Sequence, residues 1–162
     1  MKHVKYWINR LNLEAHPEGG FYSRIFTSHK AISTATGNRP SATAIHYLLE
    51  KDDFSSWHRI QHDEIWFFHT GMAITVHEIS LSGELSSRTL SHDKEISLTV
   101  KGGLWFCSEP SKQATKPELN YGLVSCVVSP GFDFIDFEMG IKETLVIAYP
   151  QHRDIISRLC RD

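Results

Sequence analysis

The sequence predicts an all-β protein, an antiparallel sandwich or barrel with a short helix near each end of the chain. Short runs rich in apolar, β-branched and aromatic residues follow one another through the middle, separated by turn residues rather than by helical patterns. The apolar spacing of a helix occurs only near the two ends. The length of 162 residues suits one domain over 1–162, with the barrel core at about 20–150.

The two terminal segments carry the helical pattern. Apolar residues in 4–11 recur at the i, i+3, i+4 and i+7 positions that share one helical face, and Pro17 ends that segment. The same spacing returns in 155–160, after Pro150, a residue that is favoured at the start of a helix. Each helix is expected to cover an apolar face of a sheet.

Alternation and turn chemistry define the strands between these helices. Apolar and polar side chains alternate in 73–79, and Ser82-Gly83 predicts a hairpin turn into the next run. Segments 34–40 and 109–120 contain Gly or Pro and are interpreted as exposed loops. The predicted strands cover 43–49, 64–69, 73–79, 85–90, 96–100, 104–107, 123–128, 134–137 and 145–148.

Composition excludes several classes of protein. The net charge of -2 argues against a partner that is a nucleic acid polymer, and 11% aromatic residues argue against a disordered chain. Cys107, Cys126 and Cys160 are odd in number and widely spaced, which favours a reducing compartment over a disulfide scaffold. The sequence carries no signal-peptide pattern and no apolar run long enough to cross a membrane. We therefore expect a soluble, cytoplasmic protein without a membrane partner.

The most informative stretch is 58–71. It resembles the first motif of the cupin superfamily: His-x-His, three or four residues, Glu, six residues, Gly. His58 stands at the first histidine, Ile60 at the second, and Glu64 and Gly71 have the six-residue separation. The second cupin motif, Pro-x-Gly-x-x-His, corresponds here to 101–106, where Phe106 replaces the histidine.

These replacements bear on metal binding. In metal-binding cupins three histidines and one glutamate hold a transition metal, and Ile60 and Phe106 have no lone pair to offer. We therefore expect no metal ion and no other cofactor. His62 or His69 could complete a weak site, although alternation along a strand leaves open whether either side chain turns inward.

Four motifs narrow the resemblance. The chain resembles the domain-of-unknown-function 985 (DUF985) family of cupins in four segments: 16–22, 56–59, 63–66 and 129–134. The similarity extends over roughly 11–152. The resemblance implies a small β-barrel that is usually a homodimer and has no settled activity. Three residues depart from the family pattern: Arg24 stands in place of Glu, Lys101 in place of Pro, and Phe106 in place of Gln.

The cupin register implies that His58 and Glu64 face the barrel interior. A histidine beside an interior carboxylate can act as a general base near neutral pH, which makes the two residues catalytic candidates. The alternative is a buried pair that fixes strand register.

Aromatic residues are the main candidates for a ligand-binding wall. Trp66 shares the face of Glu64 by the two-residue period, and Phe68, Trp105, Phe106 and Tyr47 complete the set. Filling of the core is the alternative role for each ring.

Segment 18–24 is faintly similar to a ligand-contacting strand of deoxysugar-nucleotide 3,5-epimerases, which are cupins. Gly19 replaces the arginine of that strand, but Arg24 could offer a guanidinium to a phosphate instead. The alternative is a turn followed by an interface strand. In 130–137, Asp133 and Asp136 are expected to lie outside the core or to cap backbone N–H groups.

The sequence leaves several functions open. Metal-independent binding of a small polar ligand, containing a nucleotide or a sugar, is favoured because an interior His and Glu lie among aromatic rings. An epimerase or isomerase with His58 as base is the first alternative, and a metal-dependent enzyme is the second. An inert structural dimer is the remaining possibility.

Overall fold

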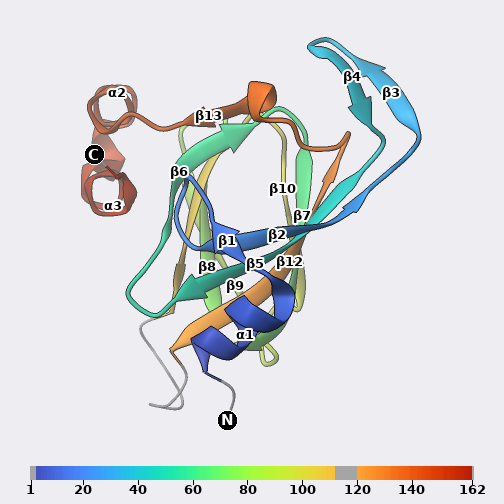
Figure 1. The fold of residues 1–162 in the computed structure, drawn as a ribbon. Coiled ribbons are helices and arrows are strands. Elements are labelled where there is room, and N and C mark those ends of the chain that lie inside the picture. The colour runs from blue at the N-terminus through green and yellow to red at the C-terminus, as the bar shows by residue number, and fades with distance from the viewer. Residues whose placement is uncertain (1–2, 112–119, 162) are drawn as a thin grey trace.

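The computed structural model of the protein describes residues 3–111 and 120–161. Most of the predicted loop at 109–120 therefore lies outside the described residues. Two antiparallel sheets face each other and form the walls of a barrel (Figure 1). The order of strands is β1-β2-β5-β12-β7-β10 in one sheet and β13-β6-β11-β8-β9 in the other, and β3 and β4 form a separate hairpin.

The elements have the following bounds. The helices are α1 (Val4–Leu11), α2 (Lys142–Ala148) and α3 (Arg153–Leu159), with 3-10 turns η1 (Phe134–Asp136) and η2 (Pro150–His152). The strands are β1 (Glu14–Ala15), β2 (Phe21–Thr27), β3 (Ala31–Thr34), β4 (Gly37–Pro40), β5 (Thr43–Glu50), β6 (Ser55–Ile60), β7 (Asp63–Gly71), β8 (Ile74–Ile79), β9 (Leu85–Leu90), β10 (Ser97–Val100), β11 (Trp105–Pro110), β12 (Tyr121–Ser129) and β13 (Phe137–Met139).

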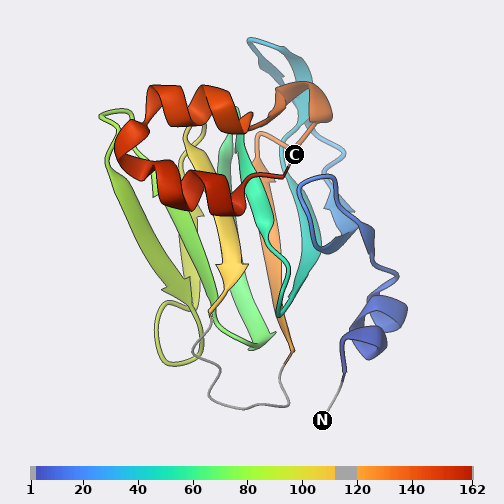
Figure 2. The same cartoon turned by 90° about the vertical axis from the view of Figure 1, so that its left-hand side faces the viewer.

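Three apolar clusters hold this arrangement together. The largest fills the barrel between the two sheets and includes Tyr47, Trp66 and Phe106. A second cluster lies between the outer face of the five-stranded sheet and helices α2 and α3, which cross that face in Figure 2. A third lies between α1 and the outer face of the six-stranded sheet. The helices therefore cover sheet faces as the sequence predicted.

Most predicted strands are confirmed within a residue or two, and β8 and β9 form the predicted hairpin. Two predictions were wrong. Residues 34–40 belong to the β3–β4 hairpin, with Arg39 buried, rather than to an exposed loop. Residues 145–148 end helix α2, where Leu145 is buried and Ile147 is 81% exposed, because periodicity cannot distinguish a short apolar run in a helix from one in a strand.

Two further segments differ from the prediction in detail. The predicted strand at 134–137 begins as the 3-10 turn η1, and only Phe137 continues into β13. Strand β6 was not among the predicted runs, because serine, histidine and arginine interrupt its apolar pattern. No helix in 3–111 or 120–161 is long and apolar enough to cross a membrane.

An ionic cluster joins α3 to the five-stranded sheet. The guanidinium of Arg158 donates two hydrogen bonds to the carboxylate of Glu109, and the Nε2 atom of His77 lies 3.2 Å from the same carboxylate. Burial alone would raise the pKa of Glu109, but the hydrogen bonds and positive charge of these partners outweigh it and lower the pKa to about 2. This cluster fixes the helical layer to the barrel at a distance from the interior.

Candidate functional site

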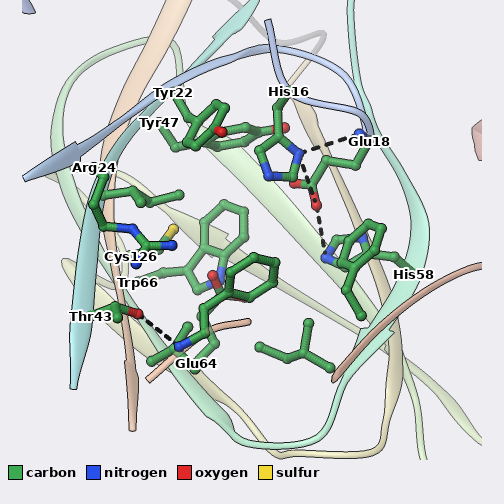
Figure 3. Close-up of a pocket in the computed structure, with 15 residues that line it drawn as sticks. His16, Glu18, Tyr22, Arg24, Thr43, Tyr47, His58, Glu64, Trp66 and Cys126 are labelled. Atoms are coloured by element: carbon green, nitrogen blue, oxygen red, sulfur yellow. Dashed lines mark hydrogen bonds and ion pairs between the residues drawn. The ribbon is translucent and has the colours of Figure 1, made fainter. Parts of the chain in front are cut away.

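A small cavity lies between the two sheets. Its interior volume is about 40 Å³, which is space for roughly three water molecules. Arg24 is the exposed member of its lining, so the cavity opens to solvent beside this side chain. The lining residues, drawn in Figure 3, are His16, Glu18, Tyr22, Arg24, Thr43, Ile45, Tyr47, His58, Ile60, Glu64, Trp66, Cys126, Val128, Phe132 and Phe137.

Strand alternation sets which side chains enter the cavity. In β6, His58 and Ile60 face inward, and Trp57, which precedes them, faces the cluster under α2 and α3. In β7, Glu64 and Trp66 face inward, two residues apart as the sequence predicted. The two strands belong to different sheets, so His58 and Glu64 enter from different walls.

The structure brings together five of the predicted site residues in this lining: Arg24, Tyr47, His58, Glu64 and Trp66. It places the other three elsewhere. Trp105 points away from the barrel, where its ring lies 4.6 Å from the guanidinium of Arg59. Phe106 is buried in the core with its ring centroid 4.1 Å from that of His58, and Phe68 packs against the core outside the lining. Because neighbours on a strand face opposite sides, Trp105 and Phe106 cannot both face the interior.

A tight turn brings an acidic residue into the cavity next to β2. Gly19 and Gly20 adopt φ angles of 114° and 71°, a region that favours glycine. The hydroxyl of Tyr47 donates to the Gly19 carbonyl at 2.7 Å, and the Gly20 N–H donates to a carboxylate oxygen of Asp53 at 2.9 Å. These contacts fix the turn and place the side chain of Glu18 against β6.

His58 and Glu18 share a proton. The Nδ1 atom of His58 lies 2.7 Å from the Ser56 carbonyl, which can only accept, so Nδ1 carries a hydrogen. The Nε2 atom lies 3.1 Å from Oε2 of Glu18, and this contact also needs one proton between its atoms. The hydroxyl of Ser55 donates to the other Glu18 oxygen at 2.9 Å. Glu18 is therefore the carboxylate that orients His58, whereas the sequence had paired His58 with Glu64.

His16 completes this side of the cavity. Its Nδ1 atom accepts a hydrogen bond from the backbone N–H of Glu18 at 3.3 Å, so the remaining proton lies on Nε2 and the ring is neutral. Burial lowers the pKa of His16, which agrees with that assignment. The dashed lines in Figure 3 join His16, Glu18 and His58.

Glu64 has a different environment. No ion pair joins its carboxyl group to another residue within the described ranges, its polar neighbours are the indole of Trp66 and the thiol of Cys126, and the residue is 8% exposed. Burial, followed by the negative charge of Glu18, raises the pKa of Glu64 to about 8, although Trp66 and Cys126 lower it in part. Glu64 is consequently a neutral acid near pH 7 and can donate a proton.

The donor set does not fit a bound metal ion. Within 3–111 and 120–161, no three His, Cys, Asp or Glu side chains gather in an arrangement that could hold one. His62 lies at the rim, with Nε2 3.6 Å from a carboxylate oxygen of Asp136. His69 lies on the outer face, with Nε2 2.6 Å from the hydroxyl of Ser125. Neither histidine joins His58 and Glu64.

A buried ion pair supports the rim of the cavity. The Nε atom of Arg39, on β4, donates to Asp136 at 2.6 Å, and Thr36 donates to the other carboxylate oxygen at 2.6 Å. Asp133 accepts a hydrogen bond from the backbone N–H of Ile135 at 3.0 Å, a cap that the sequence analysis had considered. Phe137, which follows Asp136, reaches the cavity from this supported segment.

Sequence reasoning missed several lining residues. His16 and Glu18 were part of a recognised motif, and the adjacent Gly-Gly turn was the signal that could have assigned them to the site. Cys126, which the sequence analysis considered only for disulfide formation, is buried and faces the cavity. Tyr22 and Phe132 carried no signal beyond their motifs.

Comparison with known proteins identifies close structural relatives. The sequence profile of the family described as Cupin superfamily (DUF985) matches residues 5–140. A hypothetical protein from Leishmania major is 31% identical with a TM-score of 0.93, and the match covers 99% of this chain and 100% of that one. A protein from Shewanella oneidensis is 35% identical with a TM-score of 0.89, over 99% of each chain.

A more distant likeness concerns the fold alone. A variant of oxalate decarboxylase from Bacillus subtilis is 12% identical, with a TM-score of 0.59, over 90% of this chain and 36% of that one. No curated protein matches the chain.

Proposed function

The chain belongs to the DUF985 family of the cupin superfamily, and we propose that its barrel cavity binds a small polar organic molecule without a metal ion. The observation that carries this proposal is the pairing of two unlike polar groups in one cavity. One wall presents Glu18 and His58, which share a proton, and the other presents the neutral acid Glu64. Together they supply hydrogen-bond donors and acceptors inside an otherwise apolar barrel.

The size of the cavity limits what it encloses. An interior of about 40 Å³ holds a group of roughly three non-hydrogen atoms. A ligand that contains a sugar or a nucleotide would place one end inside, and the rest would extend past Arg24 into solvent. Trp66 and Tyr47 provide flat apolar walls for the enclosed part.

Ligand binding is expected to raise the melting temperature of the protein. A panel of sugars, sugar phosphates, nucleotides and small organic acids should include a compound that raises it by about 5–10 °C at a concentration of 100 Kd. The Ile45→Phe variant, which fills the cavity from β5, should lose this response. Trp105→Phe, on the outer face of β11, should keep it. No shift with any compound, or an equal shift in Ile45→Phe, would count against the proposal.

A second function, proton transfer of the epimerase or isomerase type, is favoured by the two carboxyl groups of the cavity. Both ring nitrogens of His58 are already bonded, so the proton acceptor that faces the ligand is the Glu18 carboxylate, with His58 behind it. Glu64 would donate its proton to a ligand oxygen from the opposite wall. Such groups, with different protonation states in one site, are suited to acid–base catalysis.

Isotope exchange tests the second function. The compounds that raise the melting temperature are incubated with the protein in D₂O, and NMR follows deuterium incorporation at carbon. Substituting Glu18→Gln is expected to slow incorporation by roughly 10²-fold or more, whereas Glu143→Gln, at an exposed position of α2, leaves the rate unchanged. Equal rates in the wild type and Glu18→Gln would exclude this function and leave the binding proposal intact.

We also propose that two copies of the chain assemble, as the family resemblance implied. Ile25 and Phe26 on β2 are 49% and 52% exposed, and Ile32 on the neighbouring β3–β4 hairpin is 40% exposed. A homodimer that covers these side chains would remove apolar surface from water.

A further inference from the structure

The charges that line the cavity do not balance. Glu18 and His58 share one proton and together carry no net charge. If the proton lies on Nε2 of His58, an imidazolium faces a carboxylate; if it lies on Glu18, a neutral imidazole faces a neutral carboxylic acid. His16 is neutral, since its Nδ1 atom accepts a backbone hydrogen bond. Burial raises the pKa of Tyr47 and of Cys126, which keeps both side chains protonated.

Arg24 adds a positive charge that nothing in the lining cancels. Its guanidinium points into the cavity from β2 in Figure 3 and lies 6.0 Å from the centroid of the Phe132 ring. Over the described ranges, no carboxylate lies within ion-pair distance of it. Glu64, the remaining acid, is neutral near pH 7, so the cavity carries a net charge of +1.

An unpaired donor lies deeper in the cavity wall. The indole N–H of Trp66 is buried and makes no hydrogen bond of full geometry among the residues that the structure describes, although it lies close enough to the Glu64 carboxyl to lower the pKa of that group. It lies on the same face of β7 as the protonated carboxyl of Glu64. A buried donor without an acceptor is costly, and an oxygen atom of a bound ligand would supply that acceptor.

We propose that the cavity selects a small organic anion, which pairs with Arg24 at the mouth and directs an uncharged oxygen toward Glu64 and Trp66. The proposal rests on the binding function argued above and adds the chemical class of the ligand. A carboxylate or a phosphate ester could supply the anionic oxygens, because guanidinium binds either group through two parallel hydrogen bonds.

Matched pairs of compounds test the proposal by calorimetry at pH 6.5. The probes are lactate with lactamide, glucuronate with glucose, and glycerol 3-phosphate with glycerol, so that each pair differs in charge. The anion of the best-binding pair should bind roughly ten- to a hundredfold more tightly than its neutral partner. Arg24→Gln should abolish this difference, and Arg153→Gln, at an exposed position of α3, should preserve it. Comparison of lactate and glucuronate with glycerol 3-phosphate shows whether a carboxylate or a phosphate supplies the anionic oxygens that bind Arg24.

The pH dependence gives a second readout. Lactate keeps one charge from pH 6 to pH 9, whereas Glu64 ionises near pH 8 and then cancels the charge of Arg24. The affinity of the wild type for lactate should therefore fall roughly ten- to a hundredfold between pH 6 and pH 9. The affinity of Glu64→Gln for lactate should stay constant over this range. The charged and titratable groups around Glu64 are His16, Glu18, Tyr22, Arg24, Tyr47, His58 and Cys126, and all of them remain in that variant.

The outcomes separate the two proposals. Neutral partners that bind as tightly as the anions, or an anion preference that survives Arg24→Gln, would overturn the ligand class and leave metal-free binding standing. Absence of binding by all six probes, together with no compound that shifts the melting temperature, would refute the binding function itself.

Discussion

Raising the pH from 6 to 9 is expected to destabilise the wild-type protein by about 3 kcal/mol more than the Glu64→Gln variant. The pKa of Glu64 is raised in the fold to about 8, from 4.5. A raised pKa contributes stability that is fully present below pH 4.5 and is lost as the pH rises through 8. Glutamine mimics the protonated acid and does not titrate. The Glu64→Gln variant should therefore lose only the stability that depends on the titration of other groups.

Urea unfolding at several pH values between 5 and 9 measures this difference directly. Glu50→Gln is the matched control, because Glu50 lies at an exposed position at the end of β5. The control should follow the wild type at every pH. Parallel curves for the wild type and Glu64→Gln would mean that Glu64 is ionised in the folded protein at pH 6, and the charge argument for the cavity would fail.

The second large effect has the opposite sign and lies at acid pH. Glu109→Gln is expected to lower the free energy of unfolding at pH 7 by about 1–2 kcal/mol and to make stability less sensitive to acid. The folded pKa of Glu109 is about 2, from 4.5. A lowered pKa gives stability that is present above pH 4.5 and is lost as the pH falls through 2. The full shift corresponds to about 3 kcal/mol, which we reduce because Arg158 is 44% exposed and solvent screens the pair.

Denaturant unfolding at pH 7 and pH 3 provides the test. The wild type should lose stability between these values by more than Glu109→Gln does. Glu84→Gln, in the exposed β8–β9 turn, serves as the control and should match the wild type. A variant as stable as the wild type at pH 7 would show that the Glu109–Arg158 contact contributes nothing to holding α3 on the sheet.

Sequence periodicity predicted the fold and part of the site. The two-residue period placed Glu64 and Trp66 on one face of a strand, and the structure has both in the cavity lining. The same rule, applied to Trp105 and Phe106, would have shown that the two rings face opposite sides. Phe106 faces the interior but fills the core below His58 instead of lining the cavity.

The partner of His58 could not be predicted from local pattern. Glu18 and His58 are 40 positions apart, and the turn at Gly19 and Gly20 determines their contact. The sequence offered Glu64 because it was close in the motif, yet the two residues belong to facing sheets. Protonation states depend on burial and on neighbours across the barrel, which a single sequence does not specify.

Native mass spectrometry of the protein purified without a histidine tag tests the central claim most directly, because it detects both organic ligands and metal ions on the intact chain. The account predicts an organic mass, carried at up to one copy per chain and released on denaturation, with no transition metal. A stoichiometric metal ion that is lost when His58 and Glu64 are substituted would contradict it.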